Sequence, residues 1–118
     1  MRTEMNPTSL TYLSLISGLL YIFLGTPMAM GKVKPNCLYG FRTEKTFSSP
    51  TVWHKANVFA GKVFIVCGLV VLVLGTVYAA IVARFGIGKA AMGFVAVAIE
   101  MVPFLIALRI CFRYLATL

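Results

Sequence analysis

The stretch that decides the fold is "SSPTVWHKANVFAGKVFIVCGLVVLVLGTVYAAIVA", which runs from Ser48 to Ala83. Ser49 is of a type that caps free backbone amides, and Pro50 suits the first position of a helix, where its missing N–H is not needed. A helix of about 34 residues over 50–83 would be about 50 Å long, whereas the hydrocarbon core of a membrane is roughly 30 Å thick. We therefore predict one long helix whose first turns extend beyond the membrane.

The composition predicts that the whole chain is an integral membrane protein. The chain has 118 residues, of which 60% are hydrophobic and only 12% charged, and its mean hydropathy is +0.93. These values are far from those of a soluble domain. We predict an all-α fold in a single domain over 1–118: a small bundle of three transmembrane helices at about 10–30, 50–83 and 90–113, with a loop over 31–49. The first apolar run is longer than that of a secretory signal, and we expect it to be retained.

The basic residues predict the orientation in the cell (inner) membrane. The net charge is +8. Eight cations fall in the first loop, near the start of the second helix or at the end of the third: Lys32, Lys34, Arg42, Lys45, Lys55, Lys62, Arg109 and Arg113. Arg2, Arg84 and Lys89 fall on the opposite side. The positive-inside rule then places loop 31–49 and the C-terminus in the cytoplasm and the N-terminus outside. Anionic lipid headgroups account for this basicity, and we expect no nucleic-acid partner.

Small residues recur along two of the predicted helices. Gly61, Gly68 and Gly75 are seven residues apart, as are Gly18 and Gly25. Such stripes let helix backbones approach closely in lipid, and they predict how the bundle packs. The three cysteines share neither a compartment nor a ligand spacing, so we predict no disulfide, no metal site and no cofactor. They are Cys37, Cys67 and Cys111.

A polar segment, "NCLYGFRTEKT" over 36–46, precedes the long helix and carries the candidate site. Trp53, Asn57 and Gly61 follow at spacing four and share one helix face. One interpretation is a loop tied to the helix ends by hydrogen bonds, with the aromatic residues at the membrane interface. The other is a recognition surface for a peptide, a protein or a lipid headgroup. The loop residues in question are Asn36, Tyr39, Gly40, Arg42, Thr43 and Thr46.

The order of these residues resembles a known family. The patterns "N-x-x-Y-G-x-R-T-x-x-T" over 36–46, "S-P", and "W-x-x-x-N-x-x-A-G-K" over 53–62 are similar to the SdpI/YfhL family of bacterial multi-pass membrane proteins. The resemblance covers about a quarter of the chain and extends the motif to Gly61 and Lys62. It implies immunity to a secreted antimicrobial peptide, or signalling in which a cytoplasmic repressor is held at the membrane. The partners that it implies are therefore a toxic peptide and a cytoplasmic repressor.

Glu100 is a second candidate, because it lies inside the third predicted span. An ionised carboxylate there would cost several kcal/mol, so we expect it to face the bundle and find a partner. The expected partners are Tyr78, Thr76 or a polar group on the first helix such as Ser14. A proton- or ligand-binding role and a structural interhelical hydrogen bond both remain open. Pro103 loosens the nearby backbone ladder, and His54 is expected to be a solvated interfacial residue.

Three classes of function follow from these observations. The first is a non-enzymatic immunity or signalling protein, which the resemblance favours. The second is a small proton-coupled exporter, which would need a homo-oligomer because three helices are too few to enclose a path. The third is a membrane-embedded hydrolase that would use Glu100, or Arg42 with Asn57. No set of nucleophile, base and orienting group is evident, so we assign no catalytic residue.

Overall fold

The chain folds into three long helices, seen in a computed structural model that describes residues 7–86 and 88–118. These are α1 (Pro7–Ala29), α2 (Pro50–Phe85) and α3 (Lys89–Leu115), with a short 3-10 turn, η1 (Thr46–Ser48), before α2. No strand occurs in the described ranges. Each of the three helices is long and apolar enough to cross a membrane. The predicted all-helical fold with three spans is confirmed, and the helix ends differ from the predicted ones by no more than three residues.

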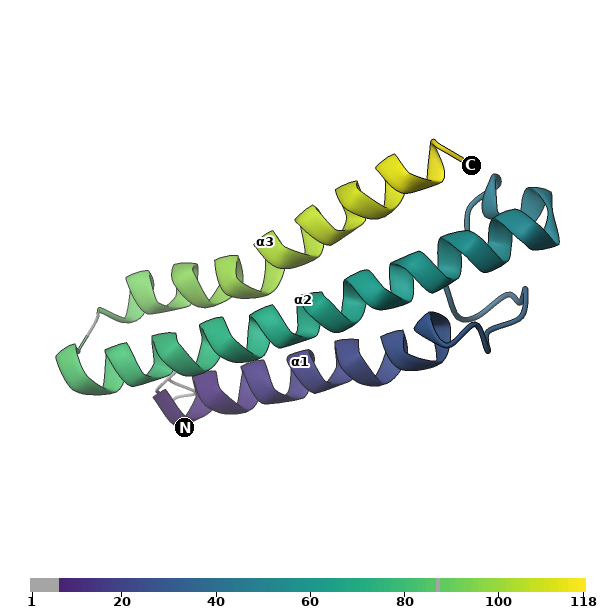
Figure 1. The fold of residues 1–118 in the computed structure, drawn as a ribbon. Coiled ribbons are helices and arrows are strands. Elements are labelled where there is room, and N and C mark those ends of the chain that lie inside the picture. The colour runs from purple at the N-terminus through teal and green to yellow at the C-terminus, as the bar shows by residue number, and fades with distance from the viewer. Residues whose placement is uncertain (1–6, 87) are drawn as a thin grey trace.

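The longest helix, α2, forms the central element of the molecule and begins as predicted. The Ser49 hydroxyl accepts a hydrogen bond from the Val52 amide at 3.1 Å, and Pro50 occupies the first turn. The helix ends at Phe85, where Gly86 takes a φ of +70°. Its 36 residues give a length of about 54 Å, close to the longest dimension of the molecule, 52 Å. In Figure 1, α2 lies between α1 and α3.

The two ends of the bundle differ in what they carry. The loop between α1 and α2 lies at the same end as the C-terminus (Figure 1). The start of α1, the end of α2 and the start of α3 lie at the other end (Figure 1). At the loop end, the Phe41 ring packs edge-on against Phe112 of α3, with ring centroids 5.2 Å apart. This shared end is the one that holds most of the cations.

The seam between α1 and α2 is closed by direct backbone approach. A Cβ added at Gly68 would lie 2.5 Å from the carbonyl oxygen of Gly18, and one added at Gly61 would lie 2.6 Å from that of Gly25. Both distances are too short for a side chain, so these positions require glycine. Ser14 takes the equivalent place against Gly75. The predicted small-residue stripes are therefore the surfaces on which α1 and α2 pack.

The seam between α2 and α3 is built from side chains instead. Cys67 and Val71 of α2 pack against Ala107 of α3. The glycine of α3, Gly93, has no neighbour within 4 Å of the position that a Cβ would take. An apolar groove of about 500 Å³ runs along this seam, with Pro103 in its lining. The three cysteines are free thiols, and Cys37 is the exposed one.

Candidate functional site

The loop turns back over α2 as soon as α1 ends. Gly31 takes a φ of +71°, and its amide donates to the Met28 carbonyl at 3.0 Å while the Lys32 amide donates to the Pro27 carbonyl at 3.0 Å. This is the pattern by which a left-handed glycine ends a helix. A Cβ at Gly31 would lie 2.7 Å from Cε1 of His54, so the chain passes close to the start of α2. His54 is exposed, as predicted.

Asn57 holds the middle of the loop through its side-chain amide. Its Oδ1 accepts a hydrogen bond from the Phe41 amide at 2.6 Å, and its Nδ2 donates to the Phe41 carbonyl at 3.2 Å. The same Nδ2 also donates to the Trp53 carbonyl one turn earlier in α2, at 3.0 Å. Asn57 is only 2% exposed. Because a buried amide is costly to leave unpaired, these three bonds fix the path of the loop at Phe41.

Trp53 holds the beginning of the loop. Its indole Nε1 donates to the Val33 carbonyl at 2.9 Å, and its ring packs against Phe47 with centroids 5.1 Å apart. The side chain is 2% exposed. Trp53 and Asn57 therefore attach two separate points of the loop, at Val33 and Phe41, to one face of α2. We call residues 33–49 together with Trp53 and Asn57 the loop platform.

Gly40 permits this close approach. Its φ is +112°, a backbone conformation that side chains other than glycine rarely adopt. A Cβ at this position would lie 2.7 Å from Oδ1 of Asn57 and 3.3 Å from Cζ2 of Trp53. Glycine is thus required here by conformation and by space.

Asn36 shapes the bend before Gly40. Its Oδ1 accepts hydrogen bonds from the amides of Leu38 at 2.9 Å and Tyr39 at 2.7 Å. Its Nδ2 donates to the carbonyls of Lys34 at 2.8 Å and Tyr39 at 2.9 Å. An asparagine that bonds its own neighbouring backbone in this way stabilises a tight turn. The turn holds the Leu38 side chain away from the protein, where it is 91% exposed.

Thr43 and Thr46 form a reciprocal pair that leads into α2. The Thr43 amide donates to the Thr46 hydroxyl at 2.7 Å, and the Thr46 amide donates to the Thr43 hydroxyl at 3.1 Å. Thr46 is completely buried. Together with the Ser49 cap, this pair provides hydrogen-bond partners for the polar groups between Thr43 and the start of α2.

Tyr39 is half-buried in the apolar cluster at the loop end, which includes Met28 and Cys111. Its hydroxyl is buried and has no hydrogen-bond partner among the described residues. Burial also raises the pKa of the phenol above its ordinary value, because the charged phenolate would lose its hydration.

Arg42 makes its hydrogen bond within the loop. The hydrolase alternative paired Arg42 with Asn57, but the structure joins Asn57 to Trp53, while the exposed Arg42 guanidinium donates to the Cys37 carbonyl. Of the last two motif residues, Gly61 is buried against α1 and Lys62 is exposed.

Glu100 bonds to α1 through a residue that we did not expect. Its Oε1 accepts a hydrogen bond from the Ser17 hydroxyl at 3.0 Å. The expectation of a first-helix partner is correct, but that partner is Ser17 rather than Ser14. Thr76 is exposed, and the buried Tyr78 hydroxyl has no partner in the described part of the chain.

Hydrogen-bond partners that contribute only backbone groups could not be identified from the sequence. Trp53 and Asn57 bond to main-chain groups of Val33 and Phe41, whose side chains give no signal of that role. Ser17 offered a weak signal, because it lies near the middle of α1, as Glu100 lies near the middle of α3.

The loop platform and the helices after it match a known family. A model of the SdpI/YfhL protein family matches residues 32–109, about two thirds of the chain. The chain belongs to the SdpI/YfhL protein family. It is 40% identical over 57 residues to a protein of Bacillus subtilis (strain 168) named Immunity protein SdpI. The aligned part is 48% of this chain but only 27% of that relative. No solved structure matches the chain.

The family match begins at the loop platform and continues through α2 into α3. The resemblance inferred from the motif is thereby confirmed. Family membership and the three apolar helices together identify a membrane protein of the SdpI/YfhL family.

Proposed function

We propose that this chain is an immunity protein that protects its cell from a secreted antimicrobial peptide. The name of the Bacillus subtilis relative supports the class of function. We assign recognition of the peptide, or of a cytoplasmic regulator, to the loop platform. The observation that carries this assignment is the fixed presentation of Leu38, which is 91% exposed on a turn held by four Asn36 hydrogen bonds.

A rigid exposed residue suits recognition better than a mobile one. A preorganised surface loses less conformational entropy on binding, so more of the contact energy appears as affinity. Around Leu38 the loop also exposes the cations Lys34 and Arg42. An apolar contact beside positive charge favours a partner with an apolar residue and a nearby acid.

The test uses the cell's own susceptibility. Deletion of this gene in its host should make growth sensitive to medium conditioned by the parent strain, and the intact gene should restore resistance. Leu38→Ser should fold normally yet restore resistance poorly, because only the exposed contact is removed. Met30→Ser is the control, since Met30 is also exposed but lies outside the platform. A deletion strain that resists the medium would contradict the proposed function.

Glu100 separates this proposal from the exporter alternative. A glutamine can still accept the Ser17 hydrogen bond but cannot titrate. If the protein confers immunity, Glu100→Gln should keep resistance across the tolerated pH range. Loss of resistance with normal folding and expression would favour a proton-coupled exporter. The hydrolase alternative has less support, because Arg42 and Asn57 bond to different partners.

We also propose that the loop platform faces the cytoplasm. Lys45 is exposed on the platform, so a single cysteine there, in a background without other cysteines, should react with a thiol reagent. A membrane-impermeant maleimide should label it only after the cells are opened. Labelling of intact cells would show the opposite orientation.

A further inference from the structure

The groove between α2 and α3 is long and wholly apolar in character. It is lined by residues between Val63 and Leu74 on α2 and between Val95 and Ile110 on α3. The stretch from Val95 to Ile110 extends about 22 Å along the helix, whereas one leaflet contributes about half of a roughly 30 Å hydrocarbon core. The groove is therefore long enough to follow a lipid chain through a whole leaflet.

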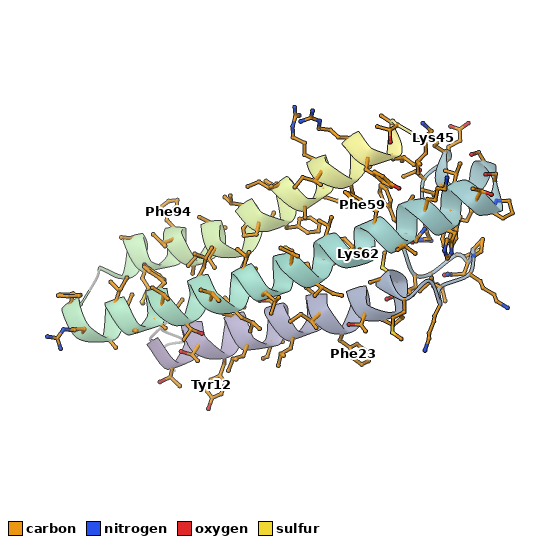
Figure 2. All side chains as sticks on the ribbon, in the orientation of Figure 1. Tyr12, Phe23, Lys45, Phe59, Lys62 and Phe94 are labelled. Carbon is orange, nitrogen blue, oxygen red and sulfur yellow. The ribbon has the colours of Figure 1, made fainter. Side chains whose placement is uncertain are left out.

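A basic notch of about 200 Å³ lies on the same two helices at the loop end, lined in part by Lys55, Phe59, Lys62 and Tyr114. The rings of Phe59 and Tyr114 stack with centroids 4.0 Å apart and planes 18° apart, which joins the two helices there. Lys55 and Lys62 are seven residues apart on α2, both are exposed, and both line the notch. Figure 2 shows Phe59 and Lys62 on the half of α2 nearer the loop.

The notch adjoins the groove along both helices. On α2, Lys62 is one helical turn from Val66, and on α3, Tyr114 is one turn from Ile110. Residues four apart on a helix are neighbours on its surface. Along one seam the surface thus changes from cationic, through an aromatic pair, to apolar. This order matches the order of phosphate, ester region and acyl chain in a phospholipid.

We propose that the α2/α3 seam binds one anionic phospholipid. The phosphate lies between Lys55 and Lys62, the ester region lies against the Phe59–Tyr114 pair, and one acyl chain occupies the groove. A second copy of this chain fits the seam less well, because a symmetric pair would bring the lysines of both notches together. Along the α1/α2 seam the glycines bring the two backbones together. The pocket on that seam, about 300 Å³, is lined by threonine and alanine side chains and has no lysine in its lining.

The charge of the notch is testable with two lipids that share the same tails. The full chain in detergent would be titrated with dioleoyl phosphatidylglycerol and with dioleoyl phosphatidylcholine, and bound lipid would be counted by native mass spectrometry. The anionic lipid should bind at least tenfold more tightly. Each lysine near a charged lipid surface contributes about 1 kcal/mol, or about fivefold. The double variant Lys55→Gln/Lys62→Gln should therefore lose most of the preference.

The matched control removes two cations from the same end of the molecule. Lys32 and Lys34 are also exposed, but neither lines the notch. Lys32→Gln/Lys34→Gln should change the lipid preference by less than twofold. Equal losses in the two double variants would show a diffuse charge effect and would overturn the proposed site, as would no loss in either.

A second pair of variants tests the groove. Val102 lines it, while Val97 on the same helix does not, and the two are 50% and 60% exposed. Val102→Phe should weaken binding of the anionic lipid severalfold, and Val97→Phe should leave it unchanged. Glycerol phosphate at millimolar concentration should not displace the lipid. Displacement by glycerol phosphate, or an unchanged affinity in Val102→Phe, would indicate a site for free phosphate and overturn the lipid assignment. Helix content and melting temperature would confirm that each variant is folded.

Discussion

The two sides of α2 are built on different principles. Toward α1, glycines let the backbones approach directly, and the loop platform is attached by Trp53 and Asn57. Toward α3, contact is made through side chains, and a groove of about 500 Å³ remains. Where the glycines let the backbones touch, the relative position of the two helices is fixed, whereas packing through side chains leaves a groove between them. One side of α2 therefore fixes the helix pair and the loop platform, and the other side leaves an open apolar groove.

The largest expected effect comes from filling the tight side. Gly61→Leu would force a side chain into the backbone of α1, because a Cβ alone would already lie 2.6 Å from the Gly25 carbonyl oxygen. We expect a loss of at least about 4 kcal/mol in the free energy of unfolding, or no folded protein. This loss can be measured by unfolding the protein in detergent while circular dichroism monitors its helix content.

Gly93→Leu is the matched control at an open position of α3. Its Cβ would meet nothing within 4 Å, and leucine favours helix over glycine by up to about 1 kcal/mol. We expect equal or greater stability. Similar losses in Gly61→Leu and Gly93→Leu would show that the loss does not arise from the close approach of α1 and α2.

A smaller loss is expected when the platform is detached. Asn57→Ala leaves the amide and carbonyl of Phe41 and the carbonyl of Trp53 without their side-chain partner. An unpaired buried polar group costs about 1–3 kcal/mol, so we expect a loss of roughly 3 kcal/mol in the free energy of unfolding. Thr76→Ala, on an exposed part of the same helix, should change it by less than about 0.5 kcal/mol. If the two variants unfold alike, the Asn57 bonds contribute nothing.

The smallest effect is a coupling energy. Because Arg42 bonds to Cys37 rather than to Asn57, the losses in Arg42→Ala and Asn57→Ala should add within about 0.5 kcal/mol. Trp53→Phe and Asn57→Ala should not add, because both side chains attach the same loop to α2, through the backbones of Val33 and Phe41. A double-mutant cycle for each pair measures the coupling. Strong coupling between Arg42 and Asn57 would show that the two side chains hold the loop as one unit.

The sequence predicts the parts of this molecule that depend on residue type and spacing. The start of α2 follows from Ser49 and Pro50, and the buried face follows from the four- and seven-residue spacing of Trp53, Asn57 and the glycines. Hydrogen-bond partners that depend on how two elements pack are harder to predict. Nothing in the Phe41 side chain indicates that its backbone amide and carbonyl bond to Asn57. The choice of Ser17 over Ser14 depends on the rotation and depth of α1 against α3, which spacing within one helix does not determine.

The loop platform is a fixed structure attached to α2, and the Phe41 amide is the group that reports on this attachment most directly. This amide donates to Oδ1 of Asn57 at 2.6 Å. Hydrogen exchange of the full chain, measured by NMR in detergent, should show strong protection at Phe41, and Asn57→Ala should remove that protection while α2 remains protected beyond Gly61. Exchange of the Phe41 amide at the rate of a free loop in the unmodified protein would contradict the account.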